Sequence, residues 1–174
     1  MISSVNRRPL LLAGLALSAG LVAGCASAPP RAESPTADAV GTVTTYHRKS
    51  SGSLGAFDGQ VVWKVDRATW EGKPVVSSTS GAGTSLHDPV THGLIANLDR
   101  SGKPIFSFDP PLAWAWPLEV GKTWTSRHAM KVHASGQTLP LEIRWTVEAY
   151  ESVTVPAGTF MAFKIVTQNN YGET

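Results

Sequence analysis

Two histidines and an aspartate near the middle of the chain have the residue types of a metal site. His87, Asp88 and His92 lie close together in the sequence, and two imidazoles with one carboxylate can hold Zn²⁺ while leaving a position open for water. The spacing matches no standard zinc motif, and Pro89 interrupts any regular scaffold between the histidines. We therefore expect a surface loop here, with no bound metal and no other cofactor.

No pattern typical of a catalytic site is found elsewhere. The run Gly81-Ala82-Gly83-Thr84-Ser85 lacks the further residues of a dinucleotide loop, a phosphate loop or a hydrolase elbow. Glu142 and Glu148 share a strand face but would lie ~20 Å apart, whereas paired carboxylates of glycosidases lie ~5 to 9.5 Å apart. His128 and His133 point to opposite faces of a strand. We assign no catalytic residue, although distant carboxylates could still converge in the fold.

Tryptophans are the side chains best suited to hold an apolar or sugar ligand. Trp114 and Trp116 alternate with alanines between prolines, so both indoles can lie on one side. Trp63 and Trp145 lie on the apolar faces of two predicted strands. The Trp114–Trp116 pair fits a strand that enters the core, and it also fits the rim of a ligand site. We take all four tryptophans as candidate ligand-binding residues.

Alternating polarity predicts the strands that position these side chains. From 121 to 166, apolar and polar residues alternate in runs that are separated by turns at 134–137 and 155–159. Further strands are predicted over 42–48, 60–66, 74–79, 93–98 and 104–108, and Pro110-Pro111 is expected to end the last of them. We predict an all-β, mostly antiparallel domain over 41–174, with about eight strands in a curved sheet, a half-barrel or an open sandwich.

One side of each predicted strand is polar, so the concave apolar side of such a sheet must be covered by another element. The sequence does not reveal that covering element. A helix, a loop, a ligand and a partner protein all remain open.

The N-terminus has the three parts of an export signal. Arg7-Arg8 precedes an apolar run over 10–22, and the run ends at Val22-Ala23-Gly24-Cys25. This ending resembles a bacterial lipobox, which implies a helical signal peptide over 1–24, cleavage before Cys25 and lipidation of its thiol. Two or more acyl chains would hold the product stably on a bilayer. Ala26 and Ser27 resemble the residues that favour sorting to the outer membrane. The paired arginines also resemble a twin-arginine signal, and the two export routes stay open.

Residues 25–40 follow as a Pro-rich stretch without aromatic residues, and they are expected to form a disordered tether. The net charge of +2 comes from Arg7 and Arg8 alone, because 13 basic residues then balance 13 acidic ones. A neutral mature chain without a basic cluster argues against nucleic acid as a partner.

Two turn motifs carry a family resemblance. Pro117-Leu118-Glu119-Val120-Gly121-Lys122-Thr123-Trp124 and Val155-Pro156-Ala157-Gly158-Thr159-Phe160 resemble motifs of TapB-like β-proteins, a group of secreted bacterial domains of unknown function. The likeness covers roughly residues 112–174 and implies no catalytic residue. It also implies a further strand after Thr174, so the chain is expected to be truncated or a fragment.

These observations favour a lipid-anchored protein on the periplasmic side of the cell envelope, on the outer membrane. We expect it to bind an apolar ligand or an envelope protein rather than to catalyse a reaction. A periplasmic hydrolase with an unrecognised site is the alternative.

Overall fold

A computed structural model describes residues 29–36, 38–51 and 56–173, and within these residues every regular element is a β-strand. The strands are β1 (Arg31–Ala32), β2 (Val43–Ser50), β3 (Phe57–Trp70), β4 (Lys73–Ser80), β5 (Gly83–His87), β6 (Leu94–Leu98), β7 (Pro104–Leu112), β8 (Leu118–Glu119), β9 (Thr123–Val132), β10 (Gln137–Val155), β11 (Gly158–Asn169) and β12 (Gly172–Glu173).

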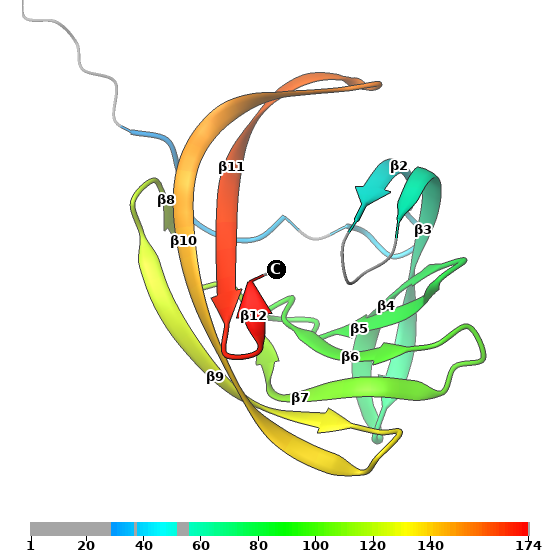
Figure 1. Ribbon diagram of the computed structural model, residues 1–174. Coiled ribbons are helices and arrows are strands. Elements are labelled where there is room, and N and C mark those ends of the chain that lie inside the picture. Colours follow the sequence, from blue (N-terminus) through cyan, green and yellow to red (C-terminus); the bar gives the residue numbers. More distant parts are fainter. Residues whose placement is uncertain (1–28, 37, 52–55, 174) are drawn as a thin grey trace, which may run out of the picture.

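Ten of these strands form one antiparallel sheet, and nearly all of them pair with their neighbours in sequence. The order is β12-β11-β10-β9-β7-β6-β5-β4-β3-β2, and β1 pairs separately with β8. The sheet curves strongly but stays open, with β2 at one edge and β11 with β12 at the other (Figure 1). The predicted all-β fold with an open, curved antiparallel sheet is confirmed. The sheet has more strands than we predicted, because β5 and β12 are too short to show a clear alternation.

The long strand β9 and the first half of β10 follow the predicted alternation. Leu141, Ile143 and Val147 on one side of β10 are buried, and the neighbouring side chains on the other side are charged and exposed. Arg127 forms an ion pair with Glu142 at 2.7 Å across the β9–β10 ladder on this outer side. The turns at 134–137 and 155–159 join the strands as expected.

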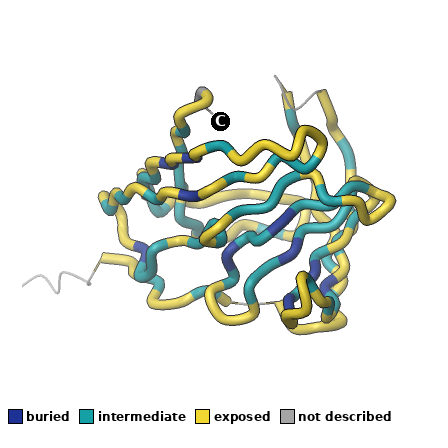
Figure 2. Tube along the Cα trace, turned by 90° about the horizontal axis from the view of Figure 1, so that it is seen from below, coloured by how far each residue is buried: buried dark blue, intermediate teal, exposed yellow. Residues whose placement is uncertain are grey.

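Strands β3 to β6 depart from the expected pattern, because they also carry apolar residues on the opposite side of the sheet. Val75, Leu86 and Ala96 form a buried cluster there. Trp70 packs beside it and meets the His133 ring edge-on, at 6.3 Å between ring centroids. Figure 2 shows that the buried positions lie along the strands, whereas most strand connections are exposed.

β7 contains the two prolines that we expected to end it. Pro110 and Pro111 lie within the strand, which continues to Leu112. A shift of register in the β6–β7 ladder and the end of the β7–β9 ladder at Asp109 leave both prolines without a paired partner. A proline is tolerated where the ladder requires no N–H.

Part of the open side of the sheet is crossed by the N-terminal segment. We expected all of 25–40 to be a disordered tether, and this is wrong for the described part of it. Arg31 and Ala32 pair with Glu119 and Leu118, and the chain then crosses the open side of the curved sheet toward β2 (Figure 1). The proline-rich composition did not reveal this docking.

Candidate functional site

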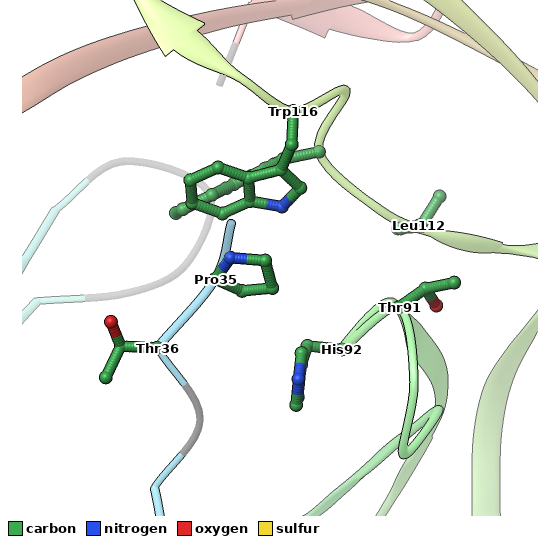
Figure 3. A pocket seen from close by; sticks show the side chains of 7 residues that line it. Pro35, Thr36, Thr91, His92, Leu112 and Trp116 are labelled. Atoms are coloured by element: carbon green, nitrogen blue, oxygen red, sulfur yellow. The ribbon is translucent and has the colours of Figure 1, made fainter. Parts of the chain in front are cut away.

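A pocket of about 240 Å³ lies between the N-terminal segment and two loops of the sheet. Its lining residues are Pro35, Thr36, Thr91, His92, Leu112, Trp114 and Trp116. Figure 3 shows the Trp116 indole above the Pro35 ring, with His92 and Thr91 across the opening. Aromatic and proline rings thus face polar groups over a small space.

The first wall is the loop over 113–117, which carries both tryptophans. Their rings lie 5.8 Å apart with an angle of 49° between the planes. The Lys122 ammonium group holds this loop, because it donates hydrogen bonds to the backbone oxygens of Ala115 and, at 2.7 Å, of Pro117. Trp114 remains 47% exposed, so its indole is available to a ligand.

The second wall is the loop between β5 and β6. One oxygen of the Asp88 carboxylate accepts hydrogen bonds from the backbone N–H groups of Val90 and Thr91 and from the Thr91 hydroxyl. These bonds favour the ionised form and lower the pKa of Asp88. His92 has a backbone φ of 56°, a left-handed conformation that is uncommon outside glycine. The loop therefore holds His92 at the pocket in a conformation that the surrounding hydrogen bonds maintain.

The two walls touch at Gly93. A Cβ atom at Gly93 would lie 3.0 Å from the Cβ atoms of Ala113 and Pro111 and 3.2 Å from the backbone oxygen of Leu112. Glycine is therefore the residue that allows these loops to approach each other. This contact holds the loop that carries His92 against the loop that carries the tryptophans.

The third wall is the N-terminal segment itself. Its position depends on the β1–β8 pairing, in which Leu118 is buried and Arg31 lies 3.6 Å from the Glu119 carboxylate. Arg31 also contacts Glu33 at 2.8 Å. Both ion pairs are exposed, so burial of Leu118 and the backbone pairing contribute more to docking than the charges do.

Of the four predicted tryptophans, the fold brings only Trp114 and Trp116 together. Trp63 lines a neighbouring pocket of about 210 Å³ with residues that include Tyr46 and His87. A hydrogen bond of 3.3 Å between His87 Nδ1 and the His92 backbone oxygen links the two pockets. Burial lowers the pKa of His87.

Trp145 belongs to a different environment. Its indole stacks on that of Trp124 with centroids 5.6 Å apart, and its Nε1–H donates a hydrogen bond to Ser126 Oγ. These contacts give Trp145 a role in the packing of β9 against β10. Cys25, the predicted lipidation site, lies outside the described residues.

The described part of the chain contains no group of three metal-ligating side chains close enough to hold an ion. In the 87–92 loop, the Asp88 carboxylate is occupied by backbone N–H groups and the His87 ring by a backbone carbonyl oxygen. The loop is therefore built around its own hydrogen bonds.

One pair of residues with the chemistry of a nucleophile and a base was missed from the sequence. Ser107 Oγ lies 3.0 Å from His133 Nε2, beside a groove of about 640 Å³ that Ser107 lines together with Trp70 and Asp109. Ser107 lies in β7 and His133 in the turn between β9 and β10. They share no motif, so no sequence signal connects them. In the described residues, no carboxylate is hydrogen-bonded to the His133 ring.

The chain matches no known family model, no curated protein and no solved structure. The resemblance to TapB-like proteins therefore stays a prediction. The described part of the chain includes no apolar helix of membrane-spanning length.

Proposed function

We propose that this chain is a lipid-anchored protein of the cell envelope whose curved β-domain binds a small apolar ligand, or one end of a larger one, in the Trp114–Trp116 pocket. The observation that carries the proposal is the pocket between the two indoles and Pro35. The same segment that leads from Cys25 forms one of its walls.

The lining supports an apolar ligand with one polar end. Trp114, Trp116 and Leu112 offer apolar surface, whereas Thr36 and Thr91 offer hydroxyl groups at the periphery. Binding sites of drug-sized ligands usually enclose ~300–1,000 Å³. A pocket of about 240 Å³ suits a single ring or the end of an acyl chain.

Placement on a membrane rests on the N-terminal pattern. The lipobox-like ending at Cys25 supports lipidation, and Ala26-Ser27 supports the periplasmic side of the outer membrane. Arg31 is paired to β8, so only a few residues separate the anchor from the domain. Such a protein would work close to the bilayer, where apolar ligands are available.

Binding of N-phenyl-1-naphthylamine, whose emission rises in apolar surroundings, tests the proposed pocket. We expect wild-type chain to enhance the emission and Trp116→Ala to lose most of the enhancement. Val90→Ala is the matched control, because Val90 is 81% exposed in the adjacent loop and does not line the pocket. Equal enhancement by wild type and Trp116→Ala would show that the pocket is not the binding site. No enhancement by wild type would favour an envelope protein as the partner.

The Ser107–His133 pair supports a second candidate, a hydrolase. Ser107 would act as the nucleophile and His133 as the base, beside a groove that can admit a substrate. A carboxylate normally orients such a histidine, and its absence among the described partners of the ring makes this the weaker candidate. Covalent labelling by a fluorophosphonate that disappears in Ser107→Ala would support the hydrolase.

A further inference from the structure

We infer that the end of the β10–β11 hairpin is a membrane-contact site, whose apolar side chains enter the bilayer to which the chain is anchored. The inference rests on the anchoring proposed above and adds a second, non-covalent point of contact. It also sets which end of the domain faces the lipid.

The hairpin end projects from the body of the sheet. β9 pairs with β10 only as far as Thr146, with a last pair of backbone hydrogen bonds at Val147. Beyond that point, β11 is the only described strand that pairs with β10, over Ala149–Val155. At ~3.3 Å per residue, the two-stranded part extends ~23 Å from the sheet. Figure 1 shows it as a long ribbon that leaves β9 and arches over the open side of the sheet.

The projecting end is apolar and uncharged. No residue from Ser152 to Phe163 carries a charge, and Glu151 and Lys164 mark the two limits of this stretch. The exposed apolar side chains of the end are Val153 at 41%, Val155 at 43%, Phe160 at 55% and Met161 at 53%. Val153 lies opposite Phe160 in the ladder, which places both on one face of the ribbon.

The backbone of the hairpin end suits an apolar environment better than an open loop would. The pairs Val153–Phe160 and Val155–Gly158 continue the ladder to the turn, and the hydroxyls of Thr154 and Thr159 bond each other at 3.0 Å. Polar groups that pair internally lower the cost of leaving water. The N–H and C=O groups on the outer edges of the ribbon still need water or lipid headgroups, so only a shallow insertion is allowed. A shallow insertion of the tip therefore does not require breaking the hairpin.

The position of the N-terminus selects a bilayer as the occupant. In Figure 1 the start of the described chain and the β10–β11 tip both lie in the upper part of the molecule, at its left and right sides, whereas the β9–β10 turn lies at the bottom. Cys25 precedes Arg31 by six residues, which reach at most ~21 Å. A lipid on Cys25 would thus hold the domain with the uncharged tip toward the membrane.

A single fluorophore at the tip tests this contact. Cys25 is the only cysteine of the chain, and its lipidated thiol would be blocked, so Phe160→Cys can be labelled alone with an environment-sensitive dye such as NBD maleimide. The full chain, produced with its own signal in a bacterial host, is reconstituted in phosphatidylethanolamine–phosphatidylglycerol vesicles with and without nitroxide-labelled acyl chains. Ser135→Cys is the control, because Ser135 is exposed in the β9–β10 turn at the opposite end of the molecule.

We expect the dye at 160 to shift to shorter wavelength and to lose emission with the nitroxide lipids, and the dye at 135 to do neither. Unchanged emission at 160 would overturn the inference, as would equal quenching at both positions. A blue shift at 160 without vesicles would also overturn it, because a second copy of the chain would then cover the tip.

The wild-type chain distinguishes failure of the anchor from failure of the tip. If wild type takes up the label, the Cys25 thiol is free and the proposed lipidation is wrong. The excess signal of Phe160→Cys over wild type with added vesicles then still decides the inference. Excess quenching by nitroxide lipids supports insertion of the tip, and no excess overturns it.

Discussion

The two halves of the sheet differ in how regular they are, and the difference separates scaffold from site. β9, β10 and β11 are long, pair in nearly continuous register and bury one side only. β4 to β7 are shorter, contain several register shifts and carry an apolar cluster on the opposite side. The Trp114–Trp116 pocket lies where the short strands end in loops. The projecting hairpin lies where β10 and β11 extend beyond the end of their pairing with β9.

This contrast follows from what each half must do. Long alternating strands form a stiff surface with few choices of register. Such a surface can support the pocket and can extend beyond its neighbours as a hairpin. Short strands with bulges and prolines redirect the chain often, so loops from distant positions can meet. Three segments meet at the pocket. Lys122 fixes the tryptophan loop, Asp88 fixes the β5–β6 loop, and the β1–β8 pair fixes the N-terminal segment.

The largest effects are expected from cavities in the two cores. Leu86→Ala in the short-strand half and Ile143→Ala in the long-strand half should each lower the free energy of unfolding by about 2–5 kcal/mol. Both side chains are at least nine-tenths buried. If the halves form one cooperative unit, thermal unfolding followed by circular dichroism will show a single transition in both variants. Two separate transitions in either variant would show that the halves unfold independently.

Gly93 tests whether loop contact sets the pocket. Gly93→Ala adds a methyl group 3.0 Å from two neighbouring Cβ atoms, so we expect a loss of about 2 kcal/mol in denaturant titration and weaker binding of the naphthylamine probe. Gly81→Ala is the matched control, because a Cβ there meets nothing within 4 Å and its change should stay within about 0.5 kcal/mol. Equal losses in both variants would contradict the close packing of the loops.

Lys122 tests how the long-strand half supports the site. Lys122→Met removes two hydrogen bonds to the tryptophan loop and should cost about 1.5 kcal/mol, near the lower limit for bonds from a charged donor, because the site is partly open to water. The free energy of probe binding should fall by more than the free energy of unfolding. Lys103→Met provides an exposed control on the β6–β7 turn. Unchanged probe binding in Lys122→Met would show that the tryptophan loop does not need Lys122 to form the binding site.

The smallest effect concerns pH and the short-strand half. Burial lowers the pKa of His87 in the folded state, so the unfolded chain binds the proton first as pH falls below about 6.5. The contribution of neutral His87 to the free energy of unfolding is fully present above that pH. It declines as the pH falls toward the pKa of His87 in the folded state. His87→Gln should therefore lose less melting temperature than wild type between pH 7 and pH 5. An equal loss in both would exclude His87 as a source of the acid sensitivity.

The parts of the fold that the sequence predicts are those that depend on near neighbours. Alternation at Leu141, Ile143 and Val147 identified a strand, its buried side and both flanking turns. Alternation says nothing about pairing across the sheet, so it could not show that Pro110 and Pro111 lie in a strand where the ladder needs no N–H.

The site was predictable only in part, for the same reason. The spacing of Trp114 and Trp116 correctly placed both indoles together, but Trp63 and Trp145 went to separate environments. Pro35 was read as tether because a proline-rich segment lacks side chains to bury. Its docking comes from a two-residue strand and a buried leucine at 118, far away in sequence. Ser107 and His133 likewise meet only in three dimensions.

Native mass spectrometry of the full chain, purified from the envelope and released from detergent in the gas phase, tests the central claim most directly. The account predicts an additional non-covalent mass on wild type, which extracts into organic solvent and is absent from the Trp114→Ala, Trp116→Ala double variant. Far-ultraviolet circular dichroism must show the same β-structure in both. A wild-type chain that carries only its covalent lipid, or a double variant that retains the additional mass, would contradict the account.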